Sequence, residues 1–273
     1  MKLKMMKATW GMEGPLEQQF EQIASAGYAG IESPVIFMDD PNRFKELLKE
    51  YNLDFIAQVV TLGGASELDK HMSSFKEQVK LAYSFNPLLI VSHSAKDSMI
   101  EENQDRFFEY ALEIEQKFGI PIGHETHRSR ATFTPWTTSR LLKKFPDLKL
   151  TADISHWFCV CESGLEDQEE HLALTAERTI HIHGRVGYAE GPQVPHPAAP
   201  EYRTELKKHE NFWDRVLHIH KNQDTPFITI TPEYGPPGYM HTLPFTNHPV
   251  SDLWEVCLWM RNHFAERFSH YEN

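Results

Sequence analysis

Four ionisable side chains stand at the ends of short apolar runs, and their types are those that bind divalent metal ions. Glu125 ends the run GIPIGHE, Asp153 ends LKLTAD, His183 ends TIHIH and Glu233 ends FITITPE. Carboxylate oxygens and a neutral imidazole nitrogen suit Mn²⁺, Mg²⁺, Co²⁺ or Zn²⁺. We therefore expect one divalent ion, provided that the fold brings the four run ends together.

The motif GHETHR, residues 123–128, places a glutamate between two histidines at the end of one such run. If the run is a strand, alternate residues face the same side, so Glu125 and His127 share one face and His124 points away. Glu125 is then the inward ligand, and His127 lines the cavity above it. We expect His124 to pack against outer helices as a structural histidine.

Eight apolar runs alternate with amphipathic segments along the chain. The runs are Lys4–Trp10, Ala29–Glu32, Phe55–Val60, Leu88–His93, Gly119–Glu125, Leu148–Asp153, Thr179–His183 and Phe227–Glu233. Segments between them, such as LEQQFEQIASAG, repeat apolar residues three or four apart, as helices do. Strands that alternate with helices pair in parallel through right-handed crossovers. The pattern predicts a (β/α)8 TIM barrel, a single domain over residues 1–273. An open doubly wound sheet is the alternative, but no G-x-G-x-x-G follows an early strand.

In such a barrel the carboxyl ends of the strands hold the active site, which makes further side chains candidates for substrate contact. His156 follows Asp153 by three residues, so both can reach one substrate; alternatively, Asp153 caps a turn and His156 lies on the surface. His93 ends the fourth run, where it shapes the cavity wall or packs in the core. Trp10 offers an apolar face to a substrate or covers the core.

The motif HIHGR leaves two assignments open. His181 and His183 face the same side, so spacing alone does not decide the ligand; the outer position favours His183, while His181 fills the barrel one layer deeper. Arg185 binds a substrate hydroxyl or carboxylate, or it pairs with Glu190 to hold the following loop. That loop, residues 187–202, is rich in proline and long enough to cover a site. The last helix is expected after Pro249, with a cap at Ser251.

Composition narrows the set of partners. The 273 residues include 39 acidic and 27 basic side chains, for a net charge of -12, which would repel nucleic acid. No stretch has the apolar length of a signal peptide or a membrane span, so we expect a cytoplasmic protein without a membrane partner. The three cysteines fit no disulfide framework and are expected to be reduced. A homodimer is the expected assembly, since two-fold symmetry is the commonest.

Taken together, these motifs resemble the xylose isomerase-like TIM-barrel family, which includes sugar phosphate isomerases and epimerases. The resemblance rests on GYAGIES in the second run, HETH in the fifth, D-x-x-H in the sixth, H-x-H in the seventh and the glutamate that ends the eighth. It covers nearly the whole chain. It implies that Glu125, Asp153, His183 and Glu233 bind the metal, that His156 and Arg185 touch a small sugar or sugar-derived substrate, and that Glu125 and Glu233 are the catalytic acid and base.

The resemblance implies a role in carbohydrate metabolism as a divalent-metal-dependent isomerase or epimerase. Such an enzyme removes a proton next to a carbonyl and passes through an enediolate. A metal-dependent lyase or dehydratase acting on a keto-sugar, keto-glycoside or cyclic polyol is the alternative, because residues 187–202 exceed the corresponding loop of the epimerases. A three-zinc DNA-repair endonuclease is disfavoured by the acidic charge. A non-catalytic sugar- or metal-binding protein also stays open.

Overall fold

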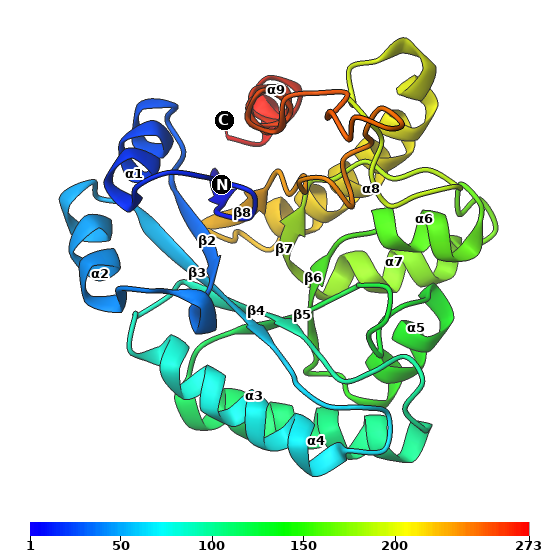
Figure 1. Cartoon of the computed structure of the whole chain (residues 1–273). Helices are drawn as coiled ribbons and strands as arrows, with labels where there is room; N and C mark the ends of the chain where they lie inside the picture. The colour runs from blue at the N-terminus through cyan, green and yellow to red at the C-terminus, as the bar shows by residue number, and fades with distance from the viewer. Residues whose placement is uncertain (273) are drawn as a thin grey trace.

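A computed structural model describes residues 1–272 and shows a closed barrel of eight parallel strands (Figure 1). The strands are β1 Lys2–Ala8, β2 Gly30–Pro34, β3 Asp54–Val60, β4 Leu89–His93, β5 Ile122–Glu125, β6 Lys149–Ala152, β7 Thr179–His183 and β8 Phe227–Thr231. Each strand pairs with the next in the sequence, and β8 closes the barrel by pairing with β1 from Lys2–Phe227 to Met5–Ile230. The predicted single-domain (β/α)8 barrel is confirmed, and the open sheet is excluded.

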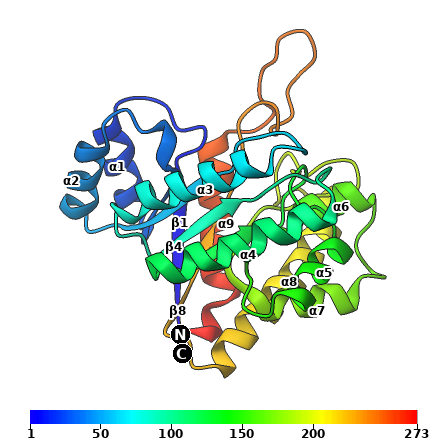
Figure 2. The same cartoon turned by 90° about the horizontal axis from the view of Figure 1, so that it is seen from below.

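Helices cover the outside of the barrel (Figures 1 and 2). They are α1 Leu16–Ser25, α2 Pro41–Glu50, α3 Leu68–Tyr83, α4 Glu101–Phe118, α5 Pro135–Lys144, α6 Ser155–Cys161, α7 Glu169–Arg178, α8 Arg203–Asn222 and α9 Leu253–Arg267, with 3₁₀ turns at Val35–Phe37, Pro200–Tyr202 and Ser269–Tyr271. Figure 2 shows both chain termini at one end of the barrel and the loop between β8 and α9 projecting from the other. Among residues 1–272, no helix combines the length and apolarity needed to cross a membrane.

Several predicted boundaries were wrong: β6 ends at Ala152 and β8 at Thr231, so Asp153 and Glu233 follow their strands, and two further boundaries differ. The first strand ends at Ala8, so Trp10 lies in the turn that follows β1 and not in the strand. The cap of the last helix is Asp252, whose Oδ1 accepts a hydrogen bond from the backbone N–H of Glu255 at 2.9 Å, and not Ser251. An aspartate directly before the first helical residue meets the unpaired N–H groups of that turn better than a serine one position earlier.

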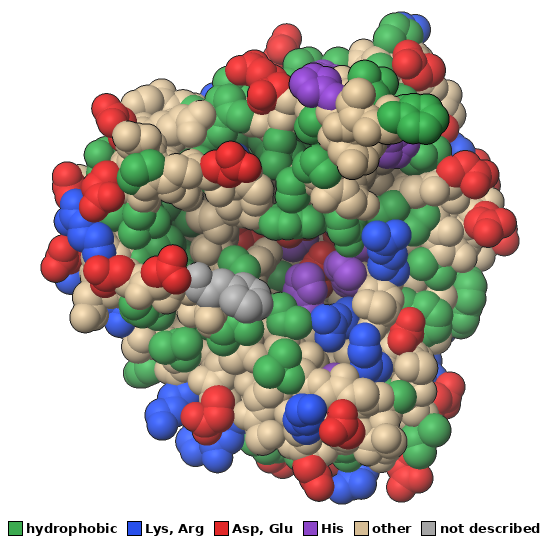
Figure 3. Space-filling model, in the orientation of Figure 1, with side chains coloured by type: hydrophobic (Ala, Val, Ile, Leu, Met, Phe, Trp, Pro, Cys, Tyr) green, Lys and Arg blue, Asp and Glu red, His purple; other side chains and the backbone are tan. Residues whose placement is uncertain are grey.

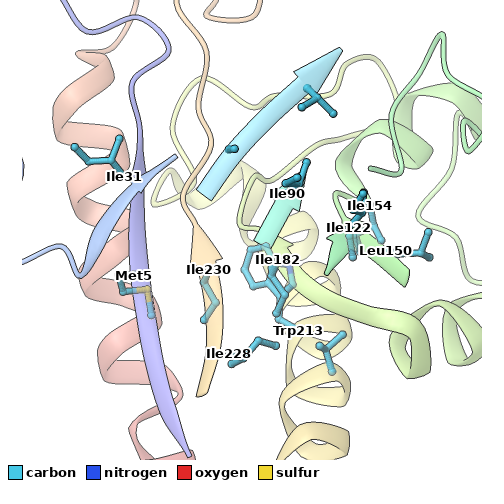
Figure 4. Packing of buried hydrophobic residues seen from close by; sticks show 14 of the residues in the cluster. Met5, Ile31, Ile90, Ile122, Leu150, Ile154, Ile182, Trp213, Ile228 and Ile230 are labelled. Atoms are coloured by element: carbon cyan, nitrogen blue, oxygen red, sulfur yellow. The ribbon is translucent and has the colours of Figure 1, made fainter. Parts of the chain in front are cut away.

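The main hydrophobic core lies between the strands and the surrounding helices, as Figure 4 shows. Outward-facing strand residues such as Ile90, Ile182 and Ile230 pack there with helix residues such as Trp213. Inside the barrel, a much smaller apolar cluster of Met6, Ile56, Leu89 and Val91 fills the part nearer the strand starts. At the strand ends the interior becomes polar, and this region positions the candidate site.

Candidate metal and substrate site

The four residues proposed as ligands converge at the carboxyl ends of neighbouring strands. Glu125 ends β5, His183 ends β7, Asp153 follows β6 and Glu233 follows β8. Each contributes one oxygen or nitrogen to a group in which all such atoms lie within 4.8 Å of one another. All four side chains are buried. The parallel register brings them together, because successive strands of a barrel end side by side.

The electrostatics of this group are dominated by three carboxylates in a buried place. Burial raises the pKa of Asp153 to about 6, with the charges of Glu125 and Glu233 adding to the effect against the opposing charge of Arg185. Burial also acts against ionisation of Glu125, but the neighbouring His93 and His183 outweigh it and hold the pKa of Glu125 well below its usual range. Concentrated negative charge of this kind attracts a cation.

The donor set fits a divalent ion. His183 Nδ1 lies 3.3 Å from Glu125 Oε1 and 3.2 Å from Glu233 Oε2, so an imidazole nitrogen and two carboxylates face a common point. Glu125 Oε2 is buried, and it meets His93 Nε2 as an ion pair without a hydrogen bond of regular geometry. Three carboxylates and one imidazole are the ligand types that Mn²⁺, Co²⁺, Zn²⁺ and Mg²⁺ accept.

Arg185 lies inside the site. Its guanidinium donates to Asp153, donates to His156 Nε2 at 2.6 Å and stands 3.6 Å from Glu233 Oε2. The alternative of a pair with Glu190 is wrong, since Glu190 is exposed and the carboxylate partners that the structure shows are Asp153 and Glu233. The guanidinium therefore braces two of the four ligand candidates.

Asp153 is not the cap of the helix that follows it, because the N-cap of α6 is Ile154. The Oδ1 atom of Asp153 does hold the turn before the helix, since it accepts a hydrogen bond of 3.0 Å from the backbone N–H of Ser155. Its Oδ2 accepts from Arg185 inside the cluster. His156 is fully buried rather than on the surface, so that part of the alternative is wrong. Its role in substrate contact stays a prediction.

A cavity of about 430 Å³ opens onto the cluster, and histidine and acidic side chains are visible at its floor in Figure 3. Its lining includes Trp10, His93, His127, Arg185 and Glu233 from the predicted set. Two larger hollows, of about 660 and 490 Å³, lie at the other end of the barrel near the starts of β5 and β3. No converging ligand group is found there among residues 1–272, so the smaller cavity is the candidate site.

The cavity has two unlike walls. One carries imidazoles: the rings of His93 and His127 lie 4.9 Å apart, and those of His127 and His156 lie 3.9 Å apart. Burial lowers the pKa of His127 to about 3, so this ring is neutral, and its Nε2 lies 3.4 Å from the Tyr239 hydroxyl. The other wall is apolar, with Trp10 and Tyr239 in an edge-to-face contact at 5.0 Å. A compact substrate with one polar and one apolar face fits such a cleft.

The other histidine of GHETHR is structural, as predicted. His124 is buried on the outer face of β5, where it stacks on Phe75 of α3 and contacts Phe108 of α4 edge-on. Its Nδ1 shares a hydrogen bond of 2.6 Å with Ser94 Oγ. The predicted alternation of this strand is therefore confirmed: His124 faces the helices and Glu125 faces the interior.

Three polar residues of the site were missed from the sequence. Glu32 lies near the end of β2 and bonds to both histidines of strand seven, so the strand-end argument used for the other ligands would have found it. Gln58 lies within β3 and donates to Glu32 at 2.8 Å and to Glu233 at 3.3 Å. Tyr239 belongs to the irregular loop before α9, where no periodic pattern marks a residue.

Two long loops close the site and are tied to each other. The loop after β7 includes Gln193, whose side chain exchanges two hydrogen bonds with the backbone of Gly235, at 2.7 and 3.1 Å, in the loop after β8. The Tyr234 hydroxyl accepts a hydrogen bond of 3.1 Å from the backbone N–H of Val186. The prediction that residues 187–202 cover the site stays a prediction, since none of them is among the residues that line the cavity.

Solved structures share this fold at low sequence identity. The crystal structure of the probable 3-DHS dehydratase AsbF from Bacillus anthracis is 17% identical, with a TM-score of 0.65 over 98% of this chain and 100% of that one. The IOLI protein with a binding zinc atom is 13% identical, with a TM-score of 0.66 over 98% and 99%. A sugar phosphate isomerase/epimerase from Parabacteroides distasonis is 15% identical, with a TM-score of 0.59 over 96% and 93%.

Identities this low establish a shared fold and no more, whereas a family model establishes the family. No curated protein matches the chain with significance. The model of the xylose isomerase-like TIM barrel matches residues 20–221, which is more than half of the sequence and includes β2 to β7 with the loops that follow them. The chain belongs to the xylose isomerase-like TIM barrel family.

Proposed function

We propose that the protein is a divalent-metal-dependent isomerase or epimerase that removes a proton next to the carbonyl of a small sugar or sugar-derived substrate. The observation that carries the proposal is the pair Glu125 and Glu233, which flank His183 Nδ1 at 3.3 and 3.2 Å beneath the cavity. A divalent ion held by Glu125, Asp153, His183 and Glu233 would polarise the carbonyl and stabilise the developing negative charge.

The residues of the chain have separate tasks in this mechanism. Glu233 lines the cavity and accepts the proton, while the electrons of the C–H bond move toward the carbonyl to give the enediolate. Arg185 Nη1 lies 3.6 Å from Glu233 Oε2 and orients that carboxylate. Glu125 delivers a proton from the other side after taking one from His93, whose Nε2 lies against Glu125 Oε2 at the cavity wall. Return to the opposite face gives epimerisation, and return to the neighbouring carbon gives isomerisation.

A dehydratase is the second candidate, and the fold likeness to the probable dehydratase AsbF favours keeping it. Its first step would be the same proton abstraction, after which a hydroxyl leaves as water. His93, which lines the cavity and lies against Glu125 Oε2, is the imidazole placed to pass a proton to that leaving hydroxyl. The two candidates therefore share the enediolate and differ in its fate.

Elemental analysis and deuterium exchange test the proposal together. We expect about one equivalent of a divalent transition metal in the purified protein and its loss from an Asp153→Ala/Glu233→Gln double variant. With Mn²⁺, Co²⁺, Zn²⁺ or Mg²⁺ added, ketoses and keto-acids of the sugar series should incorporate solvent deuterium at the carbon next to the carbonyl, as seen by NMR. A dehydratase would instead give a product that is lighter by one water.

The control is Glu210→Gln, which alters a buried glutamate bonded to His263 between α8 and α9 and leaves the barrel interior untouched. It should retain both metal and exchange. A double variant that keeps its metal would move the site elsewhere, and a wild type that exchanges no substrate hydrogen with any of the four ions would refute the proposed reaction.

A further inference from the structure

Glu32 is the most completely bonded carboxylate in the barrel interior. It is fully buried, and its Oε1 accepts hydrogen bonds from Gln58 Nε2 at 2.8 Å and from His183 Nε2 at 2.9 Å. Its Oε2 accepts from His181 Nε2 at 3.1 Å and from the Thr231 hydroxyl. Both oxygens are thus occupied by protein donors. Although Glu32, His181 and His183 lie close enough to hold an ion, this carboxylate has no oxygen left over for one.

The bond from Glu32 decides which nitrogen of His183 can bind a metal. An ionised carboxylate only accepts hydrogen bonds, so His183 Nε2 must carry its hydrogen toward Glu32. In the neutral ring the lone pair is then on Nδ1, which is the nitrogen that faces Glu125 and Glu233. Without Glu32, the hydrogen could reside on either nitrogen, and only one of the two tautomers offers a lone pair to the ligand group.

His181 extends this series of hydrogen bonds one layer deeper into the barrel. Its Nδ1 lies 2.7 Å from the Thr229 hydroxyl, which can donate to it, while its Nε2 donates to Glu32. Both ring nitrogens are therefore committed to protein partners. The order Thr229, His181, Glu32, His183 fixes each ring by a bond on the side away from the cavity. His181 accordingly supports Glu32, and His183 is the histidine available to a metal.

We propose that Glu32 is a positioning residue that sets the tautomer and orientation of His183 for metal binding. The inference rests on the proposed metal centre. A carboxylate behind a ligating histidine fixes the ring and makes its free nitrogen a better ligand, and loss of such a partner weakens metal binding by about 10- to 100-fold. Glu32 is not itself a cavity-lining residue, although it bonds to Gln58, which is one; it acts on the ligand group through His183.

The first test compares zinc affinity in wild type, Glu32→Gln and Glu210→Gln by competition with a chromophoric chelator. The glutamine has the shape of the glutamate, but its amide can donate to His183 Nε2 and so favours the wrong tautomer. We expect binding weaker by about 10- to 100-fold in Glu32→Gln and unchanged in Glu210→Gln, which replaces another buried glutamate bonded to a histidine. Circular dichroism establishes that each variant is folded.

The second test needs no variant. In zinc-loaded wild type labelled with ¹⁵N-histidine, long-range proton–nitrogen correlations distinguish the two ring tautomers. The histidine that responds to zinc should carry hydrogen on Nε2 and show the metal-dependent shift on Nδ1. Ligation through Nε2, or equal zinc affinity in folded Glu32→Gln, would refute the role of Glu32 but leave the proposed metal centre intact. A wild type that binds none of the four ions would overturn the metal centre and, with it, this inference.

Discussion

The outer layer and the inner end of the barrel use the same residue types for opposite purposes. Between strands and helices the protein is largely apolar, and His124 is paired and neutral there among Phe75, Phe108 and Ser94. At the strand ends inside the barrel, charged groups crowd together, and Glu125 lies against both His93 and His183. Stability thus resides in the first region and chemistry in the second.

Two equally buried histidines show the contrast. Burial lowers the pKa of His124 to about 3, so the ring stays neutral. Burial acts on His183 in the same direction, but the charges of Glu233, Glu32 and Glu125 outweigh it and raise its pKa well above the usual value. Equal burial therefore gives opposite results, and the neighbouring carboxylates are the reason. A metal ion would take the place of that extra proton.

The largest expected effect is the loss of catalysis in Glu233→Gln. Removing a general base costs about 10²- to 10⁴-fold in rate, whereas Arg185 keeps its partner Asp153 and Gln58 keeps an acceptor at position 233. We therefore expect deuterium exchange to fall by that factor, while the free energy of unfolding in urea changes by no more than about 2 kcal/mol. A large fall in stability with activity retained per folded molecule would reverse the contrast drawn between the two regions.

Trp213→Ala in the outer layer should do the opposite. Trp213 of α8 is fully buried, and its ring centroid lies 4.5 Å from that of Phe264 on α9. Truncating a buried tryptophan costs about 3–5 kcal/mol of stability through lost burial and a cavity. Urea denaturation measures the loss, and we expect the exchange rate per folded molecule to equal that of wild type. A rate that falls with stability intact would mean that α8 shapes the site.

The pH dependence of stability should come partly from the outer layer. His209 Nε2 accepts a hydrogen bond from the Gly187 N–H at 3.2 Å, Nδ1 donates to Glu205 O at 2.8 Å, and burial lowers its pKa from 6.5 to about 4. Because the unfolded chain binds the proton more readily, this contribution to stability is complete above pH 6.5 and is lost as the pH falls toward 4. Between pH 7 and pH 5 the loss is about 2 kcal/mol.

A matched variant isolates that contribution. In His209→Gln the side chain does not titrate, so its free energy of unfolding should fall less between pH 7 and pH 5 than that of wild type, by about 2 kcal/mol. Urea denaturation at both pH values gives the difference. Parallel pH profiles would show that His209 keeps its ordinary pKa in the folded protein and that burial among Phe158 and Trp213 is not felt by the ring.

The fold and the place of the site could be predicted because both follow from repetition. Eight apolar runs predict a closed parallel barrel, six of them end in an ionisable residue, and the ends of the last four, Glu125, Asp153, His183 and Glu233, do meet. Glu32 also ends an apolar run, but it was missed because only the ends of the later strands were considered as ligand positions. Sequence periodicity could not predict the position of Tyr239, because this residue lies in an irregular loop.

Burial depth was the other property that local sequence could not give. His156 follows Asp153 in a short helix, and the sequence does not reveal that residues after β7 and β8, Arg185 and Tyr239, contact its ring. The ring is buried because Arg185 reaches it from 29 positions away and His127 packs against it at a tilt from another strand end. Such contacts depend on how several loops close at once, whereas strand alternation depends on one strand alone.

The smallest expected effect belongs to the apolar wall, where the two regions meet. Trp10 is held against the Tyr239 ring and over Gly235, where a methyl group would lie 2.2 Å from the indole. The indole therefore presents a fixed apolar face to the cavity without touching the ligand group. Trp10→Ala should raise KM about tenfold, equivalent to about 1.4 kcal/mol of substrate binding, and leave kcat nearly unchanged, because binding is lost equally in the ground and transition states.

Trp136→Ala is the matched control, because Trp136 of α5 is half exposed and lies outside the cavity lining. Steady-state kinetics on the substrate identified by deuterium exchange should show the KM effect for Trp10→Ala alone. If kcat falls instead, with KM constant, the indole contributes to the transition state. The turn after β1, which carries Trp10, would then belong to the catalytic site and not to the apolar wall.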